Sequence, residues 1–289
     1  MFASSVLQKN EGGIVQPLTT ILIFSKNRAM QLLALLESLE GTCEDLDFER
    51  VQIVYKTTTE RHERQYEELK RLYPAISFSP ERTIAFDYMD VVRSSWHVMF
   101  LTDDSIFLRD FRIAEIEKSL GEHGDCIGFS LRLGRNITYS YPHDCSQDAV
   151  EFVEAGNGVL GLNWTLYKCD FGYPMELSGS MYRSSDLLFL SKGMNMSTLH
   201  HVESSLDRRV KDVGRDKCGL LCYPISHVFS APMNLTSAIS QNRASNTAEY
   251  SVDAMAEKFD EGYKIDVSLF RDFVPSACHQ EVTFSWKRR

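Results

Sequence analysis

Residues 96–105 read Trp-His-Val-Met-Phe-Leu-Thr-Asp-Asp-Ser, a mostly apolar run that leads directly into two adjacent carboxylates. An apolar run of this length is typical of a strand that is buried on both faces of a sheet. In an open α/β sheet, ligands bind just beyond the carboxyl ends of the strands. We therefore expect Asp103 and Asp104 at a ligand-binding edge of such a sheet.

The residues before this strand alternate between strand and helix patterns. Residues 20–24 form a short apolar run, and leucines at helical spacing follow it until Gly41. Residues 51–55 and 60–73 repeat the strand and the helix, and residues 76–78 predict a third short strand. Strands that are separated by helices imply right-handed crossovers and a mostly parallel sheet flanked by helices.

After about residue 125 the apolar segments are separated by stretches that carry glycine, asparagine, tyrosine and proline. Strand patterns occur at residues 126–133 and 164–167, and helix patterns at 184–190, 199–213 and 252–259, with Gly262 as the expected stop of the last helix. At 43% hydrophobic content the chain can bury a full core. We predict an α/β fold in one compact unit of two fused halves, residues 1–125 and 126–289.

The charge and the apolar stretches exclude some classes of protein. A formal net charge of -9 argues against a general nucleic-acid binder, because phosphate backbones are bound by clustered Lys and Arg. The longest apolar stretch, residues 21–39, contains Lys26, Arg28 and Glu37, so we expect no transmembrane segment. The first twenty residues lack a basic start before an apolar core, so we expect no signal peptide and a cytoplasmic protein.

The seven cysteines are odd in number and scattered through the chain. Cys218 and Cys222 are too far apart for a zinc knuckle, and no second pair of cysteines or histidines has the spacing of zinc ligands. Free, buried thiols are therefore favoured over a disulfide framework or a zinc knuckle.

Two adjacent carboxylates at the exposed end of a buried strand are costly unless a cation compensates them. Mg²⁺ and Mn²⁺ suit such a site, because they take oxygen ligands from one or two carboxylates and from the phosphates of a substrate. The alternative is a turn or a helix start, where Asp and Ser are both favoured.

The order of these segments resembles the nucleotide-binding half of GT-A glycosyltransferases, particularly the family 2-like ones. The resemblance is carried by residues 20–24, Ser25-Lys26-Asn27-Arg28, the helix, Tyr55-Lys56 and Thr102-Asp103-Asp104-Ser105. The family's signature is written Asp-x-Asp, and Ser105 at its third position makes this chain similar to the variant with Thr-Asp-Asp. The resemblance implies that Asp104 holds Mn²⁺ or Mg²⁺ and that Asp103 contacts the ribose or supports the site.

The resemblance extends over roughly residues 19–285 and implies further roles. Residues 173–183, which include Gly179, look like the glycine-containing loop that lies over the donor sugar. Glu203 falls where inverting members carry their catalytic base, and His279 looks like the histidine that completes the metal shell. Ser25, Arg28 and Lys56 would then contact the donor nucleotide.

Each of these residues also has an ordinary structural explanation. Glu203 lies near the start of an expected helix, where the helix dipole favours a carboxylate, and Asp186 and Asp207 are rival bases. His279 could be an ordinary packed or surface histidine. Arg28 and Lys56 could be solvated charges at a helix start and at a strand end. Arg132 and Arg135 could face a phosphate or an acceptor, and the sequence does not decide between them.

Residues 156–161 read Gly-Asn-Gly-Val-Leu-Gly and match the glycine pattern of dinucleotide-binding proteins. That pattern requires a helix after it, whereas a strand is expected next, so we predict a flexible loop.

The resemblance implies metal-dependent, inverting transfer of a sugar from a nucleoside-diphosphate sugar to an acceptor hydroxyl. Residues 1–125 would bind the donor, and residues 126–289 would bind the acceptor and carry the base. Two alternatives remain open from the sequence. The first is a nucleotidyltransferase that makes nucleoside-diphosphate sugars, which should carry a glycine-rich, basic loop after its first strand. The second is a catalytically inactive nucleotide-sugar-binding module.

Overall fold

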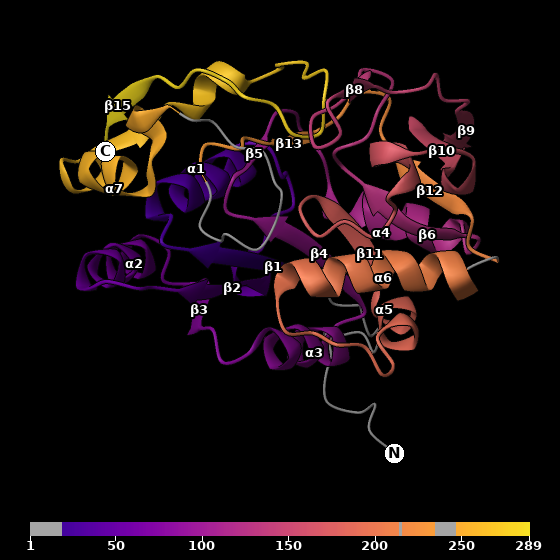
Figure 1. Cartoon of the computed structure of the whole chain (residues 1–289), viewed down its shortest axis with the longest axis horizontal. Coiled ribbons are helices and arrows are strands. Elements are labelled where there is room, and N and C mark those ends of the chain that lie inside the picture. The colour runs from indigo at the N-terminus through magenta and orange to yellow at the C-terminus, as the bar shows by residue number, and fades with distance from the viewer. Residues whose placement is uncertain (1–18, 214–215, 235–246) are drawn as a thin grey trace.

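A nine-stranded sheet in the order β3-β2-β1-β4-β11-β6-β12-β10-β9 forms the centre of the protein, with helices on both faces (Figure 1). The computed structural model describes residues 19–213, 216–234 and 247–289. The strands are β1 (Thr19–Lys26), β2 (Val51–Lys56), β3 (Ser77–Pro80), β4 (His97–Thr102), β5 (Ser105–Phe107), β6 (Cys126–Ser130), β7 (Tyr139–Ser140), β8 (Cys145–Ser146), β9 (Val153–Gly156), β10 (Val159–Asn163), β11 (Ser180–Arg183), β12 (Gly219–Cys222), β13 (Val228–Ser230), β14 (Tyr263–Ile265) and β15 (Trp286–Arg288). The α-helices are α1 (Ala29–Glu40), α2 (Glu60–Leu72), α3 (Ile84–Ser94), α4 (Ile113–Glu122), α5 (Ser184–Leu190), α6 (Leu199–Val213) and α7 (Val252–Asp260). Short 3₁₀ helices are η1 (Phe48–Arg50), η2 (Trp164–Leu166), η3 (Cys169–Gly172), η4 (Ala248–Tyr250) and η5 (Val267–Phe270).

Strands β3, β2, β1 and β4 pair in parallel, as the alternation of strand and helix patterns predicts. In the register, Phe24 of β1 lies opposite Thr102 of β4, and Lys26 of β1 lies opposite Lys56 of β2. The carboxyl ends of these three strands therefore lie along one edge of the sheet. The expected α/β class with helices flanking a largely parallel sheet is confirmed for this half of the chain.

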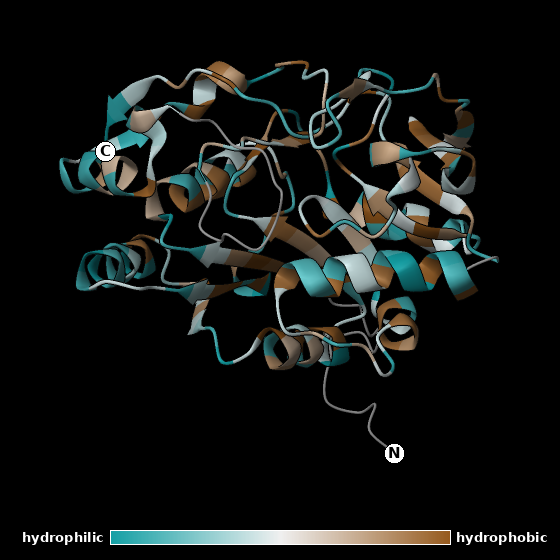
Figure 2. Cartoon of the chain, viewed as in Figure 1, coloured by the Kyte–Doolittle hydropathy of each residue, from teal (hydrophilic) through white to brown (hydrophobic). Residues whose placement is uncertain are grey.

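Two hydrophobic layers cover the two faces of the sheet. Along β1, Ile21 and Ile23 pack in one layer with α1, α2, α4 and α7, whereas Leu22 and Phe24 pack in the other with α3, α5 and α6. This alternation follows from the two-residue period of a strand. Figure 2 shows the result, with hydrophobic strands in the middle of the molecule and hydrophilic segments mainly on the outer faces of the helices.

The second half of the sheet is mixed. Strand β11 runs antiparallel between β4 and β6, β12 is parallel to β6, and β10 and β9 complete the sheet as antiparallel strands. Outside the sheet, β13 pairs antiparallel with β5, so a segment near residue 230 lies directly beside the residues that follow Asp104. Strands from residues 1–125 therefore pair with strands from residues 126–289.

Two local predictions are wrong. Residues 164–167 were expected as a strand, but β10 ends at Asn163, whose Oδ1 accepts a hydrogen bond from Thr165 N at 3.1 Å and caps the 3₁₀ helix η2. Residues 156–161 were expected as a flexible loop, but they belong to the hairpin of β9 and β10. Asn157 and Gly158 have φ of 52° and 74° at its turn, the positive values that make Asn-Gly the preferred two-residue hairpin turn.

The structure confirms the helix predicted before Gly41, and it confirms those predicted at residues 60–73, 184–190, 199–213 and 252–259 within a residue or so at their ends. Gly262 has a φ of 83° just after α7, as expected of a helix stop. Helices α3 and α4 were not predicted. The Thr83 side chain caps α3 by accepting a hydrogen bond from Phe86 N at 3.1 Å.

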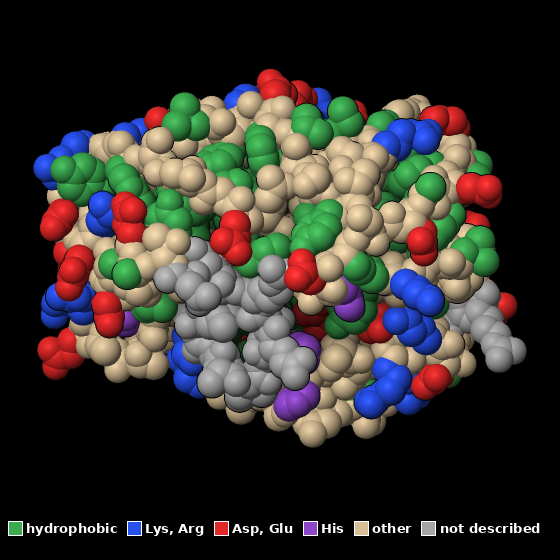
Figure 3. Space-filling model, turned by 45° about the horizontal axis from the view of Figure 1, so that its top comes forward, with side chains coloured by type: hydrophobic (Ala, Val, Ile, Leu, Met, Phe, Trp, Pro, Cys, Tyr) green, Lys and Arg blue, Asp and Glu red, His purple; other side chains and the backbone are tan. Residues whose placement is uncertain are grey.

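Across the described ranges, no helix combines the length and apolar character needed to span a bilayer. Among the described residues on the face shown in Figure 3, basic and acidic side chains are interspersed toward the two ends, and apolar side chains gather in the upper middle. All seven cysteines are free thiols, and Cys145, Cys169 and Cys218 are not buried.

Candidate active site

Asp103 lies at the carboxyl end of β4 and is the centre of a group that we call the carboxylate cluster: Ser25, Arg28, Asp103, Asp104 and Asn234. Asp103 is buried, with 3% of the whole residue exposed. Its Oδ2 accepts hydrogen bonds from Ser25 Oγ at 2.9 Å and from Lys26 N at 3.1 Å. Both donors lie at the end of β1, so the pairing of β1 with β4 builds this half of the site.

Arg28 supplies the positive charge of the carboxylate cluster. Its Nη1 lies 2.9 Å from Asp103 Oδ1 and 3.9 Å from Asp104 Oδ2. Its Nε donates to Asn234 Oδ1 at 2.9 Å, and Nη2 donates to the Asn234 carbonyl. Burial raises the pKa of Asp103, and the neighbouring Arg28 offsets this only in part. Arg28 therefore supplies part of the positive charge that two adjacent carboxylates require.

Asp104 is the more open of the two carboxylates. Its side chain has 19% relative exposure, compared with 5% for that of Asp103. Thr102 Oγ1 donates to Asp104 Oδ1 at 2.8 Å, while Oδ2 lies beyond hydrogen-bond distance of Arg28. Oδ2 of Asp104 is therefore available to bind a divalent cation.

Two residues of this region were missed by the sequence reading. The Tyr66 hydroxyl lies within hydrogen-bond distance of Ser25 Oγ and accepts a hydrogen bond from Arg28 N at 3.3 Å. Asn234 holds the guanidinium of Arg28 and donates from Nδ2 to the Tyr250 carbonyl at 2.7 Å. Tyr66 lies on the buried face of the helix predicted at residues 60–73, and its hydroxyl was the available signal. Nothing in the local sequence connects Asn234 to residues 206 positions earlier.

Lys56 lies at the same edge of the sheet but outside the cluster. Its Nζ is 2.9 Å from Glu81 Oε1, and half of the Lys56 side chain is exposed. A contact with a nucleotide, as the resemblance implies, would compete with this surface ion pair.

A second group, which we call the arginine cluster, consists of Arg132, Glu176, Ser178 and His279. Arg132 Nε lies 3.3 Å from Glu176 Oε2, and Arg132 Nη1 donates to Ser178 Oγ at 2.8 Å. The Glu176 carboxylate also accepts from Ser178 N at 2.6 Å and from Ser180 Oγ. Both charged side chains are nearly fully buried. Of the two arginines that the sequence left open, Arg132 is the one that lies inside the protein.

Serine residues connect the two clusters. Ser105 Oγ, next in the chain to Asp104, donates to the Ser178 carbonyl at 3.2 Å. Ser105 is fully buried, so the third position of the acidic signature faces the protein and supplies no metal ligand. The two clusters are therefore neighbours along one edge of the sheet.

His279 lies beside β13 on the side of the arginine cluster. Residue 279 forms a parallel bridge with Ser230, which on its other side pairs with Ser105. His279 Nε2 lies 3.5 Å from Arg132 Nη1. Because a guanidinium only donates hydrogen bonds, Nε2 acts as an acceptor, and Nδ1 carries the proton. Burial, followed by the charge of Arg132, lowers the pKa of His279 to about 3, so the ring is neutral.

The two expected metal ligands, Asp104 and His279, lie on neighbouring segments, because Ser230 pairs with both Ser105 and residue 279. Within residues 19–213, 216–234 and 247–289, no group of three or more His, Cys, Asp or Glu side chains could hold a metal ion. His279 would have to leave Arg132 before Nε2 could bind a cation. Asp104 with its open oxygen fits a site completed by substrate phosphates, which is the coordination that Mg²⁺ and Mn²⁺ accept.

Glu203 lies on α6 next to the buried stripe of Val202 and Leu206, and its side chain is half-buried. The neighbouring Tyr173 slightly favours the ionised form of Glu203. Burial raises the pKa of Glu203 to about 8, with a further contribution from Glu176 and an opposing one from Arg132. A carboxyl with such a pKa can accept a proton near neutral pH. The structure therefore places Glu203 in the electrostatic field of the arginine cluster.

The rival bases lie in different surroundings. Asp186 forms ion pairs with Arg183 at 3.2 Å and with Lys217 at 2.9 Å. Arg183 lies opposite His97 at the start of β4, so Asp186 is at the opposite edge of the sheet from Asp103 and is removed from the site. Asp207, one turn after Glu203, pairs with Lys211 at 2.7 Å.

Gly179 has a packing role that the resemblance did not imply. A Cβ atom at this position would lie 2.5 Å from Arg132 Cγ and 2.9 Å from Val228 Cγ1. The Gly179 carbonyl accepts a hydrogen bond from Leu131 N at 2.8 Å. Gly179 thus lets the residues after Glu176 approach the buried arginine.

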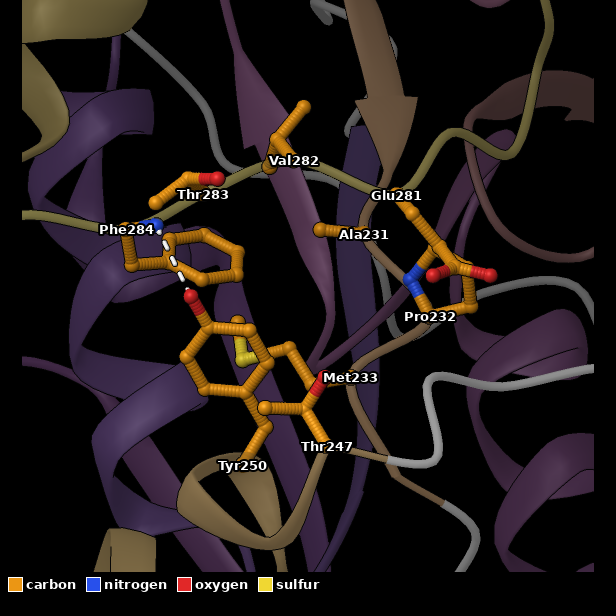
Figure 4. A pocket seen from close by; sticks show the side chains of 9 residues that line it. All are labelled: Ala231, Pro232, Met233, Thr247, Tyr250, Glu281, Val282, Thr283 and Phe284. Atoms are coloured by element: carbon orange, nitrogen blue, oxygen red, sulfur yellow. Dashed lines mark hydrogen bonds between the residues drawn. The ribbon is translucent and has the colours of Figure 1, made fainter.

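A cavity of about 340 Å³ opens beside the carboxylate cluster (Figure 4). It is lined by Ala231, Pro232, Met233, Thr247, Tyr250, Glu281, Val282, Thr283 and Phe284. Ala231 N donates to the Asp104 carbonyl at 2.8 Å, and the Tyr250 hydroxyl accepts from Phe284 N at 3.2 Å. The described lining contains hydroxyls and one carboxylate but neither Lys nor Arg, so it suits an uncharged, hydroxyl-bearing group better than a phosphate.

Comparison with known proteins adds one relative in sequence. No protein-family model matches the chain. The bifunctional glycosyltransferase pgtA of Dictyostelium discoideum is 26% identical over 193 residues, which are 60% of this chain and 25% of pgtA. This chain thus spans about a quarter of that relative's length.

Among solved structures, S. aureus TarS 1–349 in complex with UDP-GlcNAc is similar at 11% identity and a TM-score of 0.48, over 78% of this chain and 62% of that chain. The mannosyltransferase PcManGT from Pyrobaculum calidifontis, in complex with GDP-Man and Mn²⁺, is similar at 11% identity and a TM-score of 0.38, over 64% of this chain and 51% of that one. At these scores neither structure bears on the chemistry of this chain.

Proposed function

We propose that this chain is a glycosyltransferase, which moves a sugar from a nucleoside-diphosphate sugar to an acceptor hydroxyl. The observation that carries the proposal is the position of Asp103 and Asp104. They lie at the carboxyl ends of β4 and β1, where open α/β sheets bind ligands, and Asp104 keeps an open oxygen there. The similarity of 193 residues to part of pgtA supports the same activity.

The donor half is proposed to bind the nucleotide at this edge, with a divalent cation held by Asp104. Mn²⁺ or Mg²⁺ bound there would neutralise charge on the departing nucleoside diphosphate. Asp103 has a supporting role, because it fixes Arg28 and the end of β1. Ser25 faces Asp103 and Tyr66, so it would act through them. We propose His279 as a secondary ligand that joins only when Nε2 separates from Arg132.

Glu203 is the proposed base of an inverting transfer, in which it accepts the proton of the acceptor hydroxyl as the new bond forms. Three features favour Glu203 over the other carboxylates. It is half-buried, its pKa is raised to about 8, and no Lys or Arg of the described residues forms an ion pair with it. Asp207 is held by Lys211, and Asp186 lies at the other edge of the sheet.

The division into a donor half, residues 1–125, and an acceptor half, residues 126–289, is part of this proposal. The two halves share the site, because Asn234 holds Arg28 and β13 pairs with β5. The cavity beside Asp104, lined from the second half, is the proposed place of the acceptor sugar.

The alternatives make different predictions at Ser25-Lys26-Asn27-Arg28. A nucleotidyltransferase needs a glycine-rich loop here, whereas this turn uses Asn27 at a φ of 56° and has no glycine. An inactive binding module would keep the carboxylate cluster and bind a nucleotide-sugar without turnover. Ser105, buried and bonded to Ser178, is compatible with that alternative.

The proposal is tested by a thermal-shift screen of nucleoside diphosphates and nucleoside-diphosphate sugars, with Mn²⁺ and with EDTA, followed by measurement of nucleotide release. A ligand that binds the folded state raises the melting temperature by mass action. We expect at least one nucleoside diphosphate to stabilise the chain more with Mn²⁺ than with EDTA, and its sugar conjugate to be turned over. Binding without turnover on any acceptor would favour the inactive module, and stabilisation by nucleoside triphosphates alone would favour the nucleotidyltransferase.

A further inference from the structure

Two thiols from separate loops meet at the surface of the protein. The Sγ atoms of Cys145 and Cys169 lie 3.9 Å apart, although 24 positions separate the two residues in the chain. Cys145 is exposed and Cys169 is partly exposed, whereas Cys43, Cys126, Cys222 and Cys278 are buried. This pair is not used by the proposed glycosyl transfer.

The backbone on both sides fixes this approach. Cys145 begins β8, where it pairs with Ser140 of β7. Cys169 begins η3 with a φ of 51°, a left-handed conformation that is costly for a residue other than glycine. The turn is held to the hairpin, because Asp170 N donates to Gln147 Oε1 at 3.2 Å. Gln147, two residues after Cys145, thus holds Asp170, the residue after Cys169, in place.

We propose that Cys145 and Cys169 form a redox-active dithiol, which closes to an intramolecular disulfide under mild oxidation by a small disulfide such as oxidised glutathione. An S–S bond requires the sulfur atoms to approach by about 2 Å from their present separation of 3.9 Å. Neither partner needs to leave the core, since both thiols are at the surface.

The reaction proceeds through a mixed disulfide. The thiolate of Cys145 attacks one sulfur of oxidised glutathione, and one glutathione leaves as a thiolate that takes up a proton. Cys169 then attacks the Cys145 sulfur, and the second glutathione leaves in the same way. Two protein thiols are oxidised and one glutathione disulfide is reduced to two thiols. Partial burial, followed by contact with Cys145, raises the pKa of Cys169, which suits the role of the second, resolving thiol.

The bond would fix a turn that lies near the arginine cluster. Asp170 follows Cys169, and its Oδ2 atom is buried without a hydrogen-bond partner, in the field of the Arg132 charge. Closing the disulfide would therefore tie the β7–β8 hairpin to η3 and restrain Asp170 against this buried group.

The test uses the full chain, reduced and then equilibrated with glutathione at defined ratios of the reduced and oxidised forms. Remaining thiols are alkylated and counted, and disulfide-linked peptides are mapped by mass spectrometry. We expect a loss of two of the seven thiols, with one cross-link between Cys145 and Cys169. Cys145→Ser and Cys169→Ser should each abolish the cross-link, and Cys218→Ser, at another partly exposed thiol, should leave it unchanged.

Two further readouts test whether the site is preformed. The oxidised chain should melt roughly 5 °C higher than the reduced chain, because the bond closes a loop in the unfolded state. Amide hydrogen exchange at residues 168–172 should slow in the oxidised chain. A stable glutathione adduct at Cys145 without a cross-link, a different cysteine pairing, or a cross-link that lowers the melting temperature would overturn the proposal.

Discussion

The pH dependence of turnover tests the role of Glu203. A general base acts only in its deprotonated form, and the pKa of Glu203 is raised to about 8, chiefly by burial and next by Glu176. With this pKa, roughly a tenth of the molecules carry an ionised Glu203 at pH 7 and about nine tenths at pH 9. We therefore expect the rate at saturating donor, metal and acceptor to rise about tenfold between pH 7 and pH 9.

Glu203→Gln keeps the shape of the side chain and removes the proton acceptor. Turnover should fall by ~10²–10⁴-fold and lose its rise with pH, while donor affinity changes by no more than about twofold. Asp207→Asn is the matched control, since Asp207 contributes to the raised pKa of Glu203 from one turn away. This control should shift the rise to lower pH and keep the rate at its plateau. The assay is nucleotide release measured at each pH, with single-turnover rates for the two variants.

Stability gives a second reading of the same pKa. Because the folded-state pKa of Glu203 is raised above its ordinary value of 4.5, the folded protein favours the protonated form. Its contribution to stability is fully present below about pH 4.5 and is lost as the pH rises through about 8. The melting temperature of Glu203→Gln should therefore fall less between pH 6 and pH 9 than that of the parent chain. A wild-type rate that is flat with pH, together with near-normal turnover of Glu203→Gln, would refute the assignment of the base.

Three other substitutions separate ligand binding from packing. Asp104→Asn should reduce the Mn²⁺-dependent gain in nucleoside-diphosphate affinity, measured by calorimetry, by about tenfold or more. Its stability should change little, because Thr102 can still donate a hydrogen bond to the amide oxygen. Equal gains in the variant and the parent chain would show that Asp104 is not the metal ligand. His279→Ala should reduce this Mn²⁺-dependent gain in affinity less than Asp104→Asn does, because metal binding by His279 must first break its contact with Arg132. A loss as large as that of Asp104→Asn would show that His279 is a full metal ligand. Gly179→Ala should lower the free energy of unfolding by about 1–3 kcal/mol in denaturant, because its Cβ would lie 2.5 Å from Arg132 Cγ. Gly124→Ala is the control and should change stability little, because a Cβ at residue 124 would have no other atom within 4 Å. Similar stability of the two variants would contradict the packing argument.

The sequence predicted the parts of the fold that depend on local periodicity. The apolar runs of β1, β2 and β4 and the leucine spacing of α1 are local signals, and each was placed within a few residues. The hairpin of β9 and β10 was missed because its glycines were compared with a ligand-binding pattern. Its Asn157-Gly158 turn, a strong local hairpin signal, was overlooked. Helix α3 was missed although Thr83 is a good N-terminal cap.

The candidate site was predictable only where it follows a strand. Asp103, Asp104, Ser25 and Arg28 were found because parallel strands bring their carboxyl ends to one edge. The partners of these residues depend on contacts between distant parts of the chain, such as that of Arg28 with Asn234. Sequence alone also could not show that Glu176 would bury its charge against Arg132 and raise the pKa of Glu203.

The charges of the carboxylate cluster explain how Arg28 and a metal ion could act in the same site. One guanidinium charge is paired at 2.9 Å with the buried Asp103, and Asp104 lies 3.9 Å away, so the cluster retains one carboxylate charge at its exposed end. A divalent cation bound to Asp104 would leave one positive charge, and a nucleoside diphosphate supplies the oxygens and the negative charge that complete its coordination. The metal ion and the nucleotide would then bind more tightly together than alone, because the negative charge of the nucleotide neutralises the positive charge that remains once the cation is bound. In this proposal Arg28 stabilises the folded site without ligand, and Asp104 would bind the metal ion together with the nucleotide.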